Sequence, residues 1–118
     1  MTEQQIIETL ATKVMEWVKD EHFIHLKHHK KIVVLNEVLG IEKVGVTEWN
    51  PLQNLADAWQ VVEKLLENYL LFDLSATEDG WQATFKMIDT TFINTKEWEA
   101  SGDTPQEAIC TAAMELVA

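Results

Sequence analysis

A helix start followed by an apolar stripe occupies residues 49–66, which read WNPLQNLADAWQVVEKLL. Asn50 is the predicted N-cap, because its side-chain oxygen can accept from a free backbone N–H of the first turn. Pro51 fits the first helical position, where its missing N–H removes no hydrogen bond, and Gln53 is placed to complete a capping box. This pattern predicts a helix over about 50–68 with Trp59 largely buried, because apolar residues recur at helical steps at Leu52, Leu55, Trp59, Val62, Leu66 and Tyr69.

Two further helices are predicted at the ends of the chain. A capping-box pattern at residues 2–5 precedes apolar residues at helical spacing, which predicts a helix from about Thr2 to Lys19. The same pattern recurs at residues 104–107 with Pro105 at the first helical position, which predicts a helix over 104–117. One face of this last helix is rich in small residues and suits close packing on a sheet: Ala108, Ile109, Ala112, Ala113 and Leu116.

The hydrophobic period changes from 3.6 to 2 after residue 69. Alternating segments at 70–76, 81–87 and 96–100 predict a meander of three antiparallel strands. Asp79-Gly80 is a strong hairpin signal between the first two. Trp98 is expected to pack on the same sheet face as Ala100. Shorter extended pieces are predicted at 32–35 and 44–49, with a turn or hairpin rim at 36–39.

Length and composition indicate one folded domain over residues 1–118. Apolar residues make up 47% of the chain, which is ordinary for a globular protein. The predicted fold class is α+β, with an antiparallel β-sheet packed with three helices in an αβα sandwich. One cysteine excludes an internal disulfide and favours a cytosolic setting. Cys110 is expected to be a small buried hydrophobe.

The net charge and the basic residue types of the chain limit the classes of partner that are expected. The net charge is −11, and all nine basic residues are lysine. Without arginine, and with long-range repulsion of phosphates, a nucleic-acid-binding role is not expected. No apolar run is long enough to cross a bilayer, and no signal peptide is recognised, so no membrane association and a cytoplasmic location are expected. Five tryptophans in a small chain predict surplus apolar surface and hence a homo-oligomer.

A basic segment within this acidic chain is the predicted ligand site. Residues 20–31 hold all four histidines and three of the nine lysines. Lysines and protonatable imidazoles can hold an anion as point charges, and an aromatic ring can stack on a base. The hypothesis assigns an anionic, possibly nucleotide-like small molecule to His28, His29, Lys30, Lys31 and Trp49, with Trp98 as a further candidate stacking residue.

A metal-dependent reading of the same segment is the alternative. His25 and His29 would share a helix face at four-residue spacing, a geometry that can chelate a metal. No carboxylate accompanies them in an HExxH arrangement, so solvated histidines are the simpler interpretation. The sequence contains no recognised catalytic motif. We therefore assign no catalytic residue, no metal ligand and no cofactor.

Several motifs together resemble a known family. They are the Trp49-Asn50-Pro51 helix start, the segment 58–64, the Gly80-Trp81 hairpin and the segment 104–113. From about residue 45 onward the chain resembles the phage ABA-sandwich domain family, while the histidine-rich segment departs from it. The resemblance implies an α/β sandwich and a phage or prophage origin, with no activity to carry over. We therefore expect an accessory protein that binds a nucleotide-like host-defence signal or blocks a host protein. A metal-dependent hydrolase using the His22–His29 segment and a virion or assembly component stay open.

Overall fold

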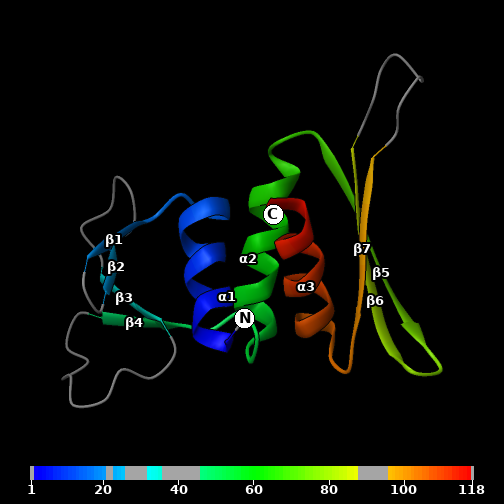
Figure 1. Cartoon of the computed structure of the whole chain (residues 1–118), viewed down its shortest axis with the longest axis horizontal. Helices are drawn as coiled ribbons and strands as arrows, with labels where there is room; N and C mark the ends of the chain where they lie inside the picture. The colour runs from blue at the N-terminus through cyan, green and yellow to red at the C-terminus, as the bar shows by residue number, and fades with distance from the viewer. Residues whose placement is uncertain (1, 21–22, 26–31, 36–45, 88–95, 118) are drawn as a thin grey trace.

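The computed structural model describes residues 2–20, 23–25, 32–35, 46–87 and 96–117, and the side chains of 2–17, 49–87 and 96–117. Three helices form the middle layer, between a small sheet and a larger one (Figure 1). The small sheet contains β1 (Val18–Asp20), β2 (Phe23–His25), β3 (Ile32–Leu35) and β4 (Val46–Trp49), and the larger contains β5 (Leu70–Thr77), β6 (Gly80–Met87) and β7 (Glu97–Gly102). The predicted α+β class, with three helices and an antiparallel three-stranded sheet, is confirmed.

The first helix is shorter than predicted. α1 (Glu3–Thr9) begins with the expected capping box between Thr2 and Gln5, and it continues as the π-helical segment η1 (Leu10–Val14). The helix then stops because Glu16 adopts a left-handed conformation with φ of 60°, and the N–H of Trp17 donates to the carbonyl of Ala11. The prediction of helix to Lys19 is therefore wrong, and residues 18–20 form β1 instead.

The second helix starts later than predicted. Asn50 caps a separate turn, because its side chain accepts from the N–H of Leu52 and its carbonyl accepts from that of Asn54. Asn54 is extended and is the true N-cap, accepting from the N–H of Asp57, and α2 runs over Leu55–Leu66. Asp57 in turn accepts from the N–H of Asn50 at 2.9 Å, the reciprocal bond that had been assigned to Gln53.

The larger sheet matches the predicted meander. β5 pairs antiparallel with β6, and β6 with β7. The turn at Glu78 and Asp79 connects β5 to β6, which begins at Gly80. The φ of Gly80 is 140°, a value that favours glycine. β3 and β4 of the small sheet pair parallel, which the sequence analysis did not anticipate. The turn or hairpin rim predicted at 36–39 lies outside the described residues.

The core lies between the larger sheet and the helices. α3 (Pro105–Val117) packs on β6 and β7, and its N-cap Thr104 accepts from the N–H of Glu107 as predicted. Gly102 allows the close approach of sheet and helix, because a Cβ there would stand 2.6 Å from the backbone nitrogen of Ala108. The fully buried residues of α3 are Ala108, Ile109, Cys110, Ala112 and Ala113. The predicted small-residue face is therefore confirmed.

Candidate binding surfaces

The residues predicted to bind an anion are only partly within the described structure. His28, His29, Lys30 and Lys31 lie outside the described residues, so their assignment stays a prediction. Trp49 is described, and only 2% of its surface is exposed. Its ring meets that of Trp17 edge to face at 4.8 Å between centroids, and its Nε1 donates to Oε1 of Gln60. Trp49 is therefore a core residue, and its proposed role as a stacking platform for a ligand is corrected.

The alternative metal site required His25 and His29 to lie on one face of a helix. His25 belongs to strand β2, where the four-residue spacing of a helix face does not apply. His22 and His29 lie outside the described residues. Within the described residues, no group of three or more His, Cys, Asp or Glu side chains is placed to hold a metal ion.

Cys110 is buried in α3, as the sequence analysis expected. Burial removes water from the thiol, which disfavours the charged thiolate and raises the pKa of Cys110 from 9.0 to about 12. The thiol is therefore neutral at physiological pH, and Cys110 acts as a packing residue.

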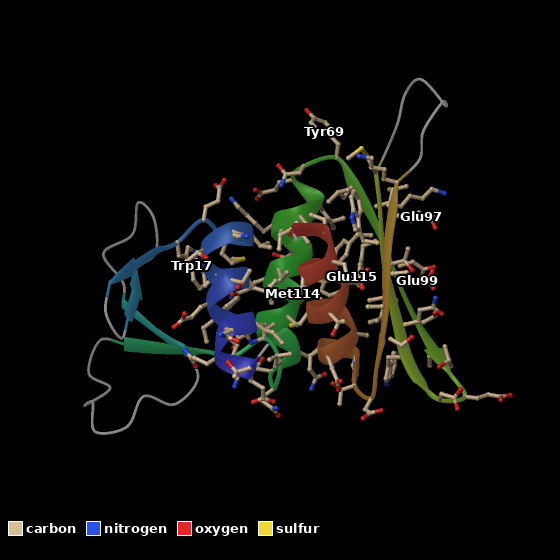
Figure 2. The ribbon with its side chains drawn as sticks, viewed as in Figure 1. Trp17, Tyr69, Glu97, Glu99, Met114 and Glu115 are labelled. Atoms are coloured by element: carbon tan, nitrogen blue, oxygen red, sulfur yellow. The ribbon has the colours of Figure 1, made fainter. Side chains whose placement is uncertain are left out.

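The outer face of the larger sheet carries a polar hollow. Alternation places one row of side chains of β5, β6 and β7 on the side away from the helices, and Figure 2 shows Glu97 and Glu99 pointing outward there. The hollow has a volume of about 570 Å³, and its charged lining consists of Asp73, Lys86, Glu97 and Glu99. Lys86 pairs with Glu97 at 3.4 Å. Carboxylates therefore outnumber cations in this hollow, which suits a cationic group.

A second hollow lies at the start of α2. It has a volume of about 330 Å³ and is lined by Asn50, Gln53, Asn54 and Asp57. Three of these residues already exchange the capping hydrogen bonds described above. Their arrangement is explained by the helix start, so we do not treat this hollow as a binding site.

Part of the apolar stripe of α2 is exposed, although the sequence pattern predicts that the stripe is buried. Leu55, Trp59 and Leu66 are 45%, 44% and 40% exposed. The face of α2 that enters the core consists of Ala58, Val61, Val62 and Leu65, so it shares Val62 with the stripe and is rotated away from Leu55, Trp59 and Leu66. The prediction that Trp59 is largely buried is therefore wrong. Helical periodicity located the apolar side of α2, but the position of its neighbours decided which part of that side is covered.

This exposed stripe runs beside β5. Only residues 67–69 link the end of α2 to the start of the strand, so helix and strand lie antiparallel and close (Figure 1). Trp59 and Phe72 meet edge to face, with 5.8 Å between ring centroids. We call Leu55, Trp59, Leu66 and the half-buried Phe72 the α2–β5 surface. Contiguous exposed apolar groups of this kind mark interaction sites more often than isolated ones do.

Tyr69 sits at one end of the α2–β5 surface in a strained conformation. Its φ is 62°, a left-handed value that disfavours a bulky side chain by about 1–2 kcal/mol. The side chain is 81% exposed and projects away from the fold (Figure 2). Folding therefore gains little from a tyrosine here, and glycine would suit the backbone better. Strained, exposed residues of this kind occur preferentially where a protein contacts something else.

Comparison with known proteins assigns the chain to a class that the fold also indicates. The model of the phage ABA sandwich domain matches residues 8–114. The chain therefore belongs to the phage ABA sandwich domain family.

One solved structure has the same fold. It is the crystal structure of a phage protein from Bacillus cereus ATCC 14579, with 23% sequence identity and a TM-score of 0.62. The alignment covers 97% of this chain and 90% of that one. No curated protein matches the chain. Within the described residues, no helix has the length and apolar character needed to span a membrane.

Proposed function

We propose that this phage-family protein is an accessory protein that acts by binding and occupying a protein partner, without chemical turnover. The observation that carries the proposal is the α2–β5 surface, where Trp59 and two leucines of one helix stay about half exposed beside a sheet edge. Tryptophan and tyrosine are the side chains that most often dominate binding at protein interfaces. The exposed Tyr69 at the end of the same surface adds to this support.

The location of these residues also supports a protein partner over a small ligand. Small-molecule sites are concave and enclose most of their ligand. The α2–β5 surface is instead a ridge of large side chains along a helix, with Phe72 beside it. Such a surface buries area only against another extended surface. A host protein whose activity the phage protein blocks is the partner that this proposal names.

A nucleotide-like signal of host defence is the second candidate ligand, at the basic segment. It is supported by the local charge of residues His28 to Lys31 within a chain of net charge −11. Trp49 no longer contributes, because it is buried. Calorimetry with cyclic and linear nucleotides tests this candidate on the wild type and on Lys30→Glu/Lys31→Glu. Binding that the double variant loses would support it, and equal or absent binding would remove it.

The two remaining alternatives have direct tests. A metal-dependent hydrolase using the His22–His29 segment requires bound metal, so metal analysis of the purified protein addresses it. A virion or assembly component would co-sediment with phage particles.

The experiment for the proposed function compares capture of host proteins by three forms of the chain. Trp59→Lys/Leu66→Lys places two charges on the α2–β5 surface. The matched control is Gln4→Lys/Thr111→Lys, because both positions are exposed on other helices and the charge change is the same. We expect one host protein to be retained by the wild type and the control and lost by the first variant. Equal retention by all three forms would contradict the proposal.

A further inference from the structure

We propose that the partner binds by adding an extended segment as a fourth strand along the free edge of β5, with alternating apolar and Lys or Arg side chains. This inference rests on the proposed function and specifies how its surface is used. It combines the α2–β5 surface on one side of β5 with the outward-facing carboxylate of Asp73 on the other.

The backbone of β5 provides the first part of the argument. The larger sheet has the order β5-β6-β7, so β5 is an edge strand, and within the described residues no strand pairs with its other side. β5 runs for the eight residues Leu70–Thr77, a length that suits an added strand. An exposed edge presents a row of unpaired N–H and C=O groups, which an extended segment can satisfy by strand addition.

The helix side of β5 specifies apolar side chains in the added strand. Residues that face the helices along β5 are Leu70, Phe72 and Leu74, and the last two are only half-buried. Trp59 stands against Phe72 and leaves 44% of its own surface exposed. Every second side chain of an added strand would project to this side. Apolar groups there would cover the exposed parts of Trp59 and Leu66.

The outer side of β5 specifies positive charge. Asp73 faces outward and lies in one row with Thr84 of β6 and Glu99 of β7. Within the described residues, Lys86 pairs with Glu97, and no cation pairs with Asp73 or Glu99. Of these carboxylates, Asp73 lies on β5 itself and adjoins the added strand, whereas Glu99 lies two strands further away on β7. A Lys or Arg beside Asp73 would complement its charge, and a basic segment is also attracted by the net charge of −11.

A second copy of this chain fits the edge less well. Its own β5 would present Leu71, Asp73 and Ser75 on the outer row, which brings a further carboxylate and no cation. Two copies also repel each other, because each carries a net charge of −11. A basic segment, by contrast, is attracted by the same negative charge. The homo-oligomer expected from composition is therefore an outcome that the experiment must distinguish.

The test uses labelled ten-residue peptides and fluorescence anisotropy with the full chain. The binding peptide alternates Lys with Val or Leu. One control peptide replaces each Lys by Glu, and a second keeps every side chain but carries N-methyl groups on alternate residues, which removes strand hydrogen bonds. We expect binding of the first peptide and affinity at least roughly tenfold weaker for each control, as for the loss of a few hydrogen bonds or charge pairs.

Protein variants locate the contact. Trp59→Lys and Asp73→Asn should each weaken binding of the Lys peptide, whereas Gln4→Lys, with the same net charge change, should not. Raised salt should weaken it as well, because charge attraction is screened. Equal binding of the N-methylated peptide, or equal weakening by Asp73→Asn and Gln4→Lys, would overturn strand addition. Loss of host-protein capture in Trp59→Lys/Leu66→Lys would in that case leave the proposed function standing.

Light scattering distinguishes the second copy. We expect no self-association that depends on the α2–β5 surface. A dimer that tightens with salt and that Trp59→Lys/Leu66→Lys dissociates would assign this edge to a second copy and overturn the inference of a basic partner.

Discussion

Helices α2 and α3 have similar sequence patterns, but their apolar sides are buried to different extents in the fold. Each begins at a polar cap, each has a proline at or shortly before its start, and each carries an apolar side. In α3 that side is fully buried from Ala108 to Ala113, and Leu116 near its end is partly buried. In α2 the largest apolar side chain, Trp59, remains 44% exposed.

The sizes of the side chains explain part of this difference. Alanines at 108, 112 and 113 bring α3 close to β6 and β7, and Gly102 removes the last steric obstacle where β7 leads into the helix. The stripe of α2 consists of large side chains, and α3 already occupies most of the inner sheet face. α2 is therefore left at the β5 edge with its stripe only partly covered. An apolar pattern predicts which side of a helix is apolar, whereas the packing of adjacent helices and strands decides how much of that side is buried.

The largest expected effect is in α3. Ile109→Ala removes a fully buried side chain against the sheet, and we expect it to lower the free energy of unfolding by about 2–5 kcal/mol. Urea denaturation followed by tryptophan fluorescence measures this. An unfolding midpoint equal to that of the wild type would mean that α3 does not anchor the core.

The matching truncation in α2 should cost less although the side chain is larger. We expect Trp59→Ala to lower the free energy of unfolding by about 1–2 kcal/mol, below the usual range for buried aromatic residues, because nearly half of the ring stays in water in the folded state. The same denaturation series tests the order of the two variants. A larger loss for Trp59→Ala than for Ile109→Ala would reverse the comparison between the helices.

The start of α2 gives a sharper test of where the helix begins. Asn54→Ala removes the side chain that accepts from the N–H of Asp57, and a loss of about 1 kcal/mol is expected. Gln53→Ala should be close to neutral, since Gln53 is exposed and is not the capping residue. Thermal unfolding of both variants separates the two helix starts; equal losses would argue for the start at Asn50.

Tyr69 separates stability from binding. Tyr69→Gly relieves a left-handed conformation, and we expect a gain in the free energy of unfolding of about 1 kcal/mol. The same variant should retain less host protein in the capture experiment, because it removes an exposed ring from the α2–β5 surface. A destabilised variant would show that Tyr69 serves the fold.

The pH dependence of stability tests whether the thiol of Cys110 in α3 is fully buried. Its pKa is raised to about 12 in the fold, so the unfolded chain loses the thiol proton first as pH rises. This contribution is fully present below pH 9 and lowers stability progressively above it. We expect the urea midpoint of the wild type to fall more between pH 8 and 10.5 than that of Cys110→Ala. An equal fall in both would mean that the thiol reaches water in the native state.

Much of the fold was accessible from local chemistry. The capping residues Thr2 and Thr104 mark true helix starts, and the Asp79-Gly80 signal marks the true hairpin. These succeed because caps and turns depend on hydrogen bonds within a few residues. The prediction of Asn50 as the N-cap of α2 failed for the same reason, since the turns at Asn50 and Asn54 offer equivalent local bonds.

The candidate surface was less accessible. Trp49 and Trp59 were assigned opposite roles to those observed, with the ligand platform buried and the core anchor exposed. Both errors concern contacts with distant segments: Trp49 is covered by Trp17, and Trp59 is left bare because α3 holds the sheet. The assignment of His28 to Lys31 stays a prediction.

The sequence by itself determined the α+β class of the protein, its three main helices, the three strands of the larger sheet, and the family to which it belongs. Those properties follow from periodicity, caps and turns, which act over short stretches of chain. Only the tertiary structure decided that β5 is a free edge and that the stripe of α2 stays exposed beside it. The exposure of the α2 stripe depends on how much of the sheet face α3 leaves uncovered. Tertiary packing decides that area, because it involves segments far apart in the sequence.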